Sequence, residues 1–174
     1  MTRRTLLASA AGLAPGLSIA GPLSGRRVPS FALPDSNQKI HDVLDYRGKP
    51  LLLDIMQTTC AHCQTMAPNL GRVKTKYTGR IGVLSIVVPP DTQASVSQFA
   101  AKYRVSSPFL FDCGQTAAAI LKVTPQSPRI NLPQLLLVDA NGMIREDWTW
   151  SEATKSIFEG QGLDAAIDRL LRAK

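Results

Sequence analysis

The sequence predicts a single α/β domain with a mostly parallel central sheet. Three apolar runs, at residues 51–56, 81–88 and 135–138, are nearly continuous, as in strands that are buried on both faces of a sheet. Segments with helical spacing separate these runs, and this alternation is typical of βαβ units. The third run ends at an Asn-Gly turn, the favoured two-residue hairpin dipeptide, so residues 143–148 are expected to return as an antiparallel strand.

The remaining elements complete a three-layer sandwich in which helices flank a mixed central sheet. Residues 28–33 alternate in hydropathy and lead into turn residues at 34–37, which predicts an N-terminal hairpin. Apolar residues three or four positions apart predict helices between the strands and at the end of the chain. These apolar positions are Met66, Leu70, Val73 and Tyr77, then Val96, Phe99 and Tyr103, and finally Leu163, Ile167, Leu170 and Leu171.

The composition is that of an ordinary globular domain. The chain has 174 residues, of which 44% are hydrophobic and 19% are charged, which suffices for one core without disulfide staples. Its net charge of +7 comes from basic residues that are scattered along the chain, and this scatter argues against nucleic-acid binding. We expect a monomer without a nucleic-acid partner.

The first twenty residues have the layout of a signal peptide. Arg3 and Arg4 precede a small and apolar run without acidic residues, and the small residues at its end suit signal peptidase. The paired arginines also resemble a twin-arginine signal. We therefore expect a signal peptide at 1–20, a flexible basic spacer at 21–27 and the folded domain at 28–174. The expected location is periplasmic or otherwise extracytoplasmic, with the protein anchored in the membrane if the signal is not cleaved.

The most specific motif is Cys60-Ala61-His62-Cys63, which follows a buried strand and opens a helix. Unpaired N–H groups and the dipole at a helix N-terminus stabilise a thiolate, and a thiolate is the species that attacks disulfides. Two intervening residues bring the second sulfur within bonding reach of the first. We therefore predict a redox-active Cys60–Cys63 disulfide, with Cys60 as nucleophile and Cys63 as resolving cysteine, and no metal or other cofactor.

Three further residues have both a functional and a structural interpretation. His62 can add positive potential and hydrogen-bond to the Cys60 sulfur, which would make the disulfide more oxidising; the alternative is an exposed histidine without a role. Asp54 lies in an apolar strand, so burial is expected to raise its pKa; the alternative is a solvated residue at a strand end. Cys113 stands alone beside an apolar strand and is expected to be small and buried, with a second resolving thiol as the alternative.

These motifs resemble the thioredoxin superfamily, and within it the exported TlpA/ResA-like thiol-disulfide oxidoreductases, which are related to AhpC/TSA proteins. The resemblance covers most of residues 28–172 and includes the opening segment 28–35 and the segment 46–50. It implies a thioredoxin-like fold with a central strand-helix insertion, to which the expected helices at 92–103 and 115–121 correspond. It also implies protein thiols or disulfides as substrates and a membrane electron-transfer partner.

The resemblance also assigns roles to single residues. Asp54 occupies the place of the buried carboxylate near the resolving cysteine of thioredoxins, and Pro68 matches the proline that kinks their active-site helix. Leu132 and Pro133 match the cis-proline loop, in which Leu132 would pair its backbone with a substrate chain. The family's usual Gly-Pro or Glu-Pro between the cysteines and the usual aromatic residue before the motif, at 56–59, are missing. These departures leave the redox direction open.

Two other functions on the same fold are alternatives. A peroxiredoxin-like thiol peroxidase would resemble Pro-x-x-x-Thr-x-x-Cys, but Leu53 and Gln57 stand at the proline and threonine positions. A copper-binding module could use two thiolates and His62 or a distant histidine, but its cysteines are usually more widely spaced and a third ligand is missing. Disulfide exchange with exported protein thiols is therefore the predicted function.

Overall fold

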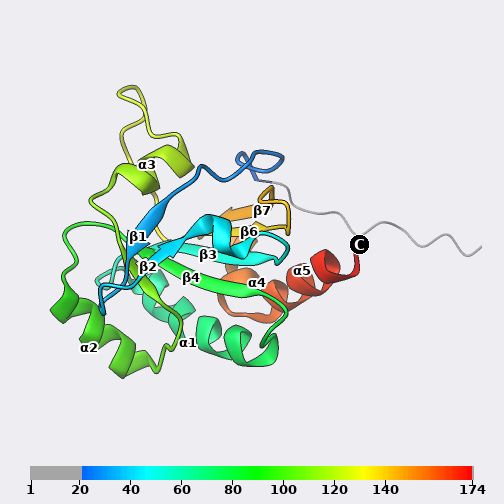
Figure 1. Ribbon diagram of the computed structural model, residues 1–174, viewed down its shortest axis with the longest axis horizontal. Coiled ribbons are helices and arrows are strands. Elements are labelled where there is room, and N and C mark those ends of the chain that lie inside the picture. The colour runs from blue at the N-terminus through cyan, green and yellow to red at the C-terminus, as the bar shows by residue number, and fades with distance from the viewer. Residues whose placement is uncertain (1–20, 174) are drawn as a thin grey trace, which may run out of the picture.

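The structure, a computed structural model, describes residues 21–173 and is built on a five-stranded sheet. Its strands are β3 (Leu51–Met56), β4 (Gly82–Val87), β5 (Phe109–Phe111), β6 (Gln134–Val138) and β7 (Ile144–Thr149). They lie in the order β5-β4-β3-β6-β7 (Figure 1). β3, β4 and β5 pair in parallel, whereas β6 is antiparallel to both of its neighbours. This mixed sheet, with its antiparallel β6–β7 hairpin, confirms the predicted fold class.

Helices cover both faces of the sheet and produce the predicted three layers (Figure 1). The helices are α1 (Ala61–Lys76), α2 (Gln93–Tyr103), α3 (Gln115–Leu121), α4 (Lys155–Phe158) and α5 (Gln161–Arg172), with 3₁₀ turns η1 (Val43–Tyr46) and η2 (Glu152–Thr154). α1, α4 and α5 pack on one face and α3 packs on the other. α2 packs beside the N-terminal half of α1. The segment α2-β5-α3 lies where the resemblance implies the insertion.

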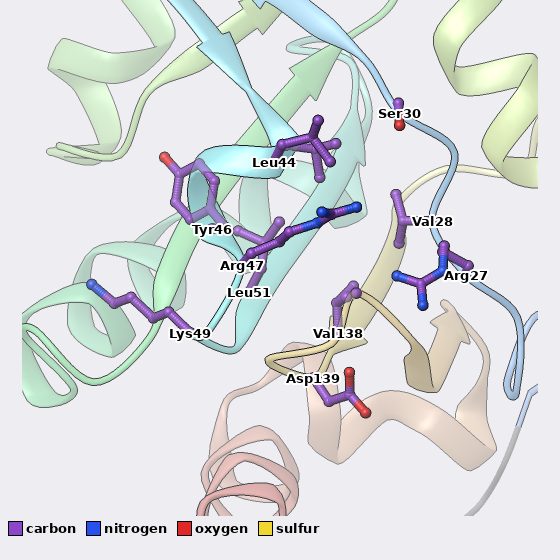
Figure 2. A pocket seen from close by; sticks show the side chains of 12 residues that line it. Arg27, Val28, Ser30, Leu44, Tyr46, Arg47, Lys49, Leu51, Val138 and Asp139 are labelled. Carbon is purple, nitrogen blue, oxygen red and sulfur yellow. The ribbon is translucent and has the colours of Figure 1, made fainter.

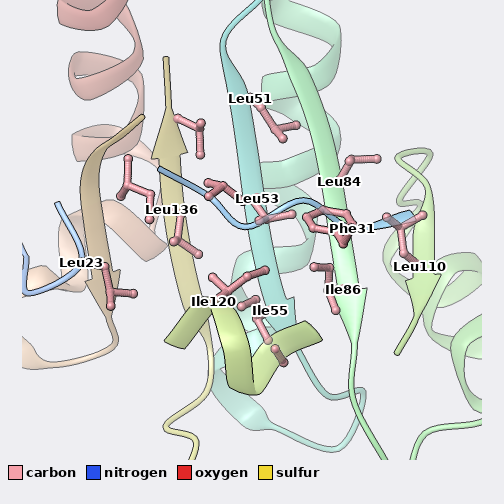
Figure 3. Close-up of a cluster of buried hydrophobic side chains, with 14 of the residues drawn as sticks. Leu23, Phe31, Leu51, Leu53, Ile55, Leu84, Ile86, Leu110, Ile120 and Leu136 are labelled. Carbon is pink, nitrogen blue, oxygen red and sulfur yellow. The ribbon is translucent and has the colours of Figure 1, made fainter. Parts of the chain in front are cut away.

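The central strand β3 sends alternate side chains to the two faces of the sheet. Leu51, Leu53 and Ile55 join the cluster on the α3 side, which Figure 3 shows. Leu52 packs in the opposite cluster, which contains α1 and α5. Asp54 follows the same alternation as Leu52, so its carboxyl group points toward the layer that contains α1.

The predicted N-terminal hairpin is present, but its first strand begins later than expected. β1 (Ala32–Pro34) pairs antiparallel with β2 (Ile40–Asp42). Residues 28–31, which were expected to belong to this strand, lie outside β1, and Val28 and Phe31 insert their side chains into the core. The hairpin lies over the β5 edge of the sheet, where Asp35 forms an isolated bridge with Leu110.

Residues 21–27 were expected to form a flexible spacer, and this expectation is wrong. Leu23 is buried in the core, and its N–H donates to the carboxylate of Asp147 at 3.0 Å. Ile144 at the start of β7 exchanges backbone hydrogen bonds with Gly25 and Arg26, each at 2.8 Å. The burial of Leu23 and the backbone pairing with the edge strand β7 hold this segment in place, although its composition is basic. The predicted signal peptide lies outside the described residues.

The turn between β6 and β7 differs from the predicted two-residue Asn-Gly turn. Gly142 has a φ of 80°, whereas Asn141 is not among the residues with positive φ. The carboxylate of Asp139 accepts hydrogen bonds from the N–H groups of Asn141 at 2.8 Å and Met143 at 3.0 Å. This side chain stabilises a longer turn, in which only the glycine adopts the left-handed conformation.

Candidate redox site

The two motif cysteines lie where β3 leads into α1. Cys60 is the N-cap of α1, and its sulfur accepts a hydrogen bond from the backbone N–H of Cys63 at 3.4 Å. Cys60 is half-buried and Cys63 is buried, and both are free thiols in this structure. The more accessible sulfur therefore sits at the positive end of the helix dipole, with the second cysteine directly behind it.

The loop before β6 completes the surface around Cys60. The Leu132–Pro133 peptide is cis, as the resemblance implies. The Cys60 thiol donates to the carbonyl oxygen of Leu132 at 3.7 Å. β6 pairs directly with β3, with Gln134 opposite Ile55, so this loop and the cysteine loop emerge side by side at one end of the sheet.

Asp54 is buried below this surface, and burial raises the pKa of its carboxyl group to about 7. The nearby hydroxyl of Ser85, its partner in the β3–β4 register, offsets this shift only in part. Within residues 21–173, Asp54 Oδ1 and Ser85 Oγ have no hydrogen-bond partner. Burial also raises the pKa of the Cys63 thiol, and the charge of Asp54 raises it further. Asp54 is thus an acid that can exchange a proton near neutral pH beside a thiol that resists losing one.

His62 does not make the hydrogen bond to Cys60 that its position suggested. Its ring stacks on the indole of Trp150, with ring centroids 3.6 Å apart and planes inclined by 14°. In the described part of the chain, the Cys60 sulfur contacts Cys63 N–H and the Leu132 carbonyl instead. An aromatic residue that follows a strand usually belongs to the core, so the contact of Trp150 with the motif has no local signal in the sequence.

A second missed residue is Asp91, which holds the loop before Cys60. Its carboxylate accepts from the backbone N–H of Thr58 at 2.6 Å, from the Thr58 hydroxyl, and from Ser95 Oγ at 3.0 Å. The Thr58 carbonyl in turn accepts from the Gln64 amide at 2.9 Å. The sequence signal for this role is an acidic residue just after β4, at the sheet end where β3 also finishes.

Other predicted or visible features lie apart from this surface. Cys113 is exposed, so the expectation of a buried residue is wrong; it lies in the short connection between β5 and α3 and not within the buried strand. Pro68 lies inside α1, as expected.

A small pocket between η1, the N-terminal segment and the β6–β7 turn includes Arg27, Arg47 and Tyr46 (Figure 2). It lies where β3 begins, at the end of the sheet opposite the cysteines.

No three His, Cys, Asp or Glu side chains among residues 21–173 come together as a metal site. In the same part of the chain, no helix is long and apolar enough to cross a membrane.

Fold and relatives together define the class of protein, which is a thiol-disulfide oxidoreductase of thioredoxin fold. The chain belongs to the AhpC/TSA family, whose family model matches residues 24–147. Within the thioredoxin superfamily it is TlpA/ResA-like. It is 29% identical over 137 residues to the thiol-disulfide oxidoreductase ResA of Bacillus anthracis, a match that covers 78% of this chain and 75% of that protein. ResA of Geobacillus kaustophilus is 27% identical over 123 residues, covering 70% and 67%.

Solved structures show the same fold. A putative thiol:disulfide interchange protein DsbE from Chlorobium tepidum matches with a TM-score of 0.65 and 23% identity, covering 82% of this chain and 96% of that one. A putative protein disulfide isomerase from Bacteroides thetaiotaomicron matches with a TM-score of 0.71 and 20% identity, covering 90% and 95%. These likenesses confirm the thioredoxin-like architecture.

Proposed function

We propose that the protein exchanges disulfides with exported protein thiols through a Cys60–Cys63 redox pair. The observation that carries this proposal is the position of the Cys60 sulfur. It lies at the N-terminus of α1, between the N–H of Cys63 and the carbonyl of Leu132. A nucleophilic sulfur, a resolving cysteine and a backbone edge for the substrate are thus within one small surface.

In the reductive direction, the Cys60 thiolate attacks one sulfur of a substrate disulfide. A Cys60–substrate disulfide forms, and the other substrate sulfur leaves as a thiolate that takes a proton from water. The helix N-terminus and the N–H of Cys63 stabilise the attacking thiolate. Because the Leu132 carbonyl faces the same sulfur, a substrate strand that pairs with Leu132 brings its cysteine into line for attack.

The second step needs the Cys63 thiolate, which burial and Asp54 both disfavour. Asp54, whose pKa is about 7, accepts the Cys63 proton as the thiol attacks Cys60. The Cys60–Cys63 disulfide forms, the second substrate sulfur leaves as a thiolate, and Asp54 passes the proton on. The reverse sequence oxidises a substrate dithiol, so the same residues act in both directions.

The signal-like residues 1–20 support export of the domain, where disulfide-bonded substrates occur. A membrane electron-transfer partner would then return the pair to its starting redox state. Secretion of the full-length chain with a compartment reporter tests the location, and pull-down with Cys63→Ser tests for the partner as a trapped disulfide.

Insulin reduction by the purified protein tests the central proposal. Cys60→Ser is expected to abolish the activity, whereas Cys113→Ser, which removes the exposed third thiol, should leave it unchanged. Full activity of Cys60→Ser would overturn the proposal. Peroxide consumption and Cu(I) titration on the same preparations test the peroxidase and copper-binding alternatives.

A further inference from the structure

We propose that Trp150 is a positioning residue that sets the reduction potential of the Cys60–Cys63 pair by stacking on His62. This inference rests on the proposed redox role of the two cysteines and deepens it. Trp150 lies outside the motif, 87 residues after Cys63 in the sequence numbering. Its indole is nonetheless 3.6 Å from the His62 ring, centroid to centroid, and nearly parallel to it.

The position of the Trp150 side chain is set by its packing against the core. Trp150 directly follows β7 and packs against the buried cluster formed by α1, α5 and the sheet. The residue before it, Thr149, pairs with Gln134 in the sheet, and their side chains share a hydrogen bond of 2.5 Å. This pairing places Trp150 beside Pro133, so the stack borders the same surface as Cys60 and Leu132.

The stack fixes the position of a group that carries charge. His62 occupies the first turn of α1, whose N-cap is Cys60, and imidazole is the side chain that ordinarily changes charge between pH 5 and 8. The face of an indole attracts cations, so the stack on Trp150 suits a side chain that can carry positive charge and holds it near Cys60. Within residues 21–173 the His62 side chain makes no hydrogen bond to Cys60, whose sulfur contacts Cys63 N–H and the Leu132 carbonyl, so its influence on Cys60 is electrostatic.

The sign of the effect follows from the charge of the reduced pair. Reduction of the disulfide takes two electrons, and in the reactive form of the reduced pair Cys60 is a thiolate and Cys63 a thiol, so that one proton is taken up. An imidazolium held nearby stabilises this reduced form and makes the pair more oxidising. Without Trp150 the imidazole turns toward solvent, its coupling to the sulfur weakens, and the disulfide becomes harder to reduce.

The test measures the equilibrium of each protein with reduced and oxidised glutathione. At pH 6, Trp150→Leu and His62→Ala should each shift the equilibrium constant toward the protein disulfide by about fivefold, or about 20 mV. The double variant should shift no further than either single variant, because both remove the same interaction. Trp150→Phe keeps an aromatic face and should restore most of the wild-type potential.

Ile157→Ala is the matched control, because Ile157 packs on the same cluster as Trp150, whereas the ring that stacks on His62 is that of Trp150. It should lower stability while leaving the potential unchanged. A wild-type potential in Trp150→Leu or an additive double variant would each overturn the inference. Failure of the proposed redox pair is recognised separately, because wild-type protein would then form no Cys60–Cys63 disulfide in the glutathione buffers.

Discussion

The sulfur of Cys60 lies 3.7 Å from the carbonyl oxygen of Leu132, although 72 residues separate them in sequence. The antiparallel pairing of β6 with β3 produces this approach, because it brings the start of one strand beside the end of the other. In the free protein the Cys60 thiol donates a hydrogen bond to this carbonyl oxygen. A bound substrate strand would replace this contact with an amide donor.

Backbone pairing at Leu132 can be tested by changing the substrate instead of the protein. A disulfide-linked peptide whose amide next to the cysteine is N-methylated cannot donate to the Leu132 carbonyl. We expect its KM to rise about threefold to tenfold, which corresponds to the ~1 kcal/mol of one hydrogen bond. The control peptide carries the methyl group four residues away. Equal KM values for the two peptides would exclude strand pairing at this carbonyl.

Cys63→Ser should trap the first step of the exchange. Without a resolving thiol, the Cys60–substrate disulfide accumulates and turnover stops. Intact-mass measurement after mixing with oxidised glutathione or insulin is expected to show one covalent adduct per chain. The same treatment of the Cys60→Ser variant should give much less adduct, since the buried Cys63 thiol has its pKa raised. Equal labelling of both variants would contradict the assignment of nucleophile and resolving cysteine.

Asp54 should make stability depend on pH near neutrality. Its folded-state pKa of about 7 lies above the ordinary value near 3.9, so the protonated form is favoured in the folded protein. The associated stability is fully present below pH ~4 and is lost as pH rises toward 7 and above. Between pH 5 and 8 the wild type should lose about 2 to 3 kcal/mol relative to Asp54→Asn. Urea unfolding of both reduced proteins at the two pH values measures this difference.

The same substitution should slow the second chemical step. Asparagine cannot accept the Cys63 proton, so release of the mixed disulfide is expected to fall about 10- to 100-fold at pH 7. Attack by Cys60 should change much less, and stopped-flow mixing with a fluorescent disulfide separates the two steps. Ser85→Ala, which keeps the carboxyl group, is the control and should retain fast release. Equal release rates in Asp54→Asn and the wild type would remove Asp54 from the mechanism.

Asp91→Ala should loosen the loop that carries Cys60. It leaves the N–H and hydroxyl of the buried Thr58 without their acceptor, at a cost of about 1 to 3 kcal/mol. Exchange activity should fall because the position of Cys60 becomes less defined. Asp42→Ala removes a comparable carboxylate that accepts from Leu44 N–H far from the cysteines. It should lower stability without lowering the exchange rate; a similar loss of activity in both variants would rule out a specific role for Asp91.

Local patterns were sufficient to predict the central strands of the five-stranded sheet and the position of the cysteine motif at a helix N-terminus. A continuous apolar run such as 51–56 is best buried as a strand with both faces covered. Cys60 follows this strand and precedes a segment with helical spacing, which predicts its position at the start of the helix. The buried state of Asp54 also followed from its apolar neighbours. Each of these conclusions depends on residues close together in the sequence.

The missed contacts all join distant segments. Trp150 meets His62 through the pairing of β7 with β6, and Asp91 meets Thr58 through the parallel register of β3 and β4. Trp150 carries no local signature, since an aromatic residue after a strand usually belongs to the core. The position of Asp91 after β4 is a signal, but an acidic residue before a helix usually caps it, so the contact with Thr58 does not follow from the sequence alone. Likewise, the basic residues around Leu23 concealed that this one side chain is buried.

The packing of residues 21–27 on β7 also protects the sheet from unwanted association. β7 is an edge strand of the sheet. The backbone N–H and C=O of Ile144 form hydrogen bonds with Arg26 and Gly25, and would otherwise be free to pair with another molecule. An unprotected strand edge is a template for edge-to-edge pairing and aggregation. A protein shortened to begin at Val28 would expose this edge together with the cavity left by Leu23. Recombinant preparations that start at Gly21 should therefore stay in solution at concentrations at which the shorter chain precipitates.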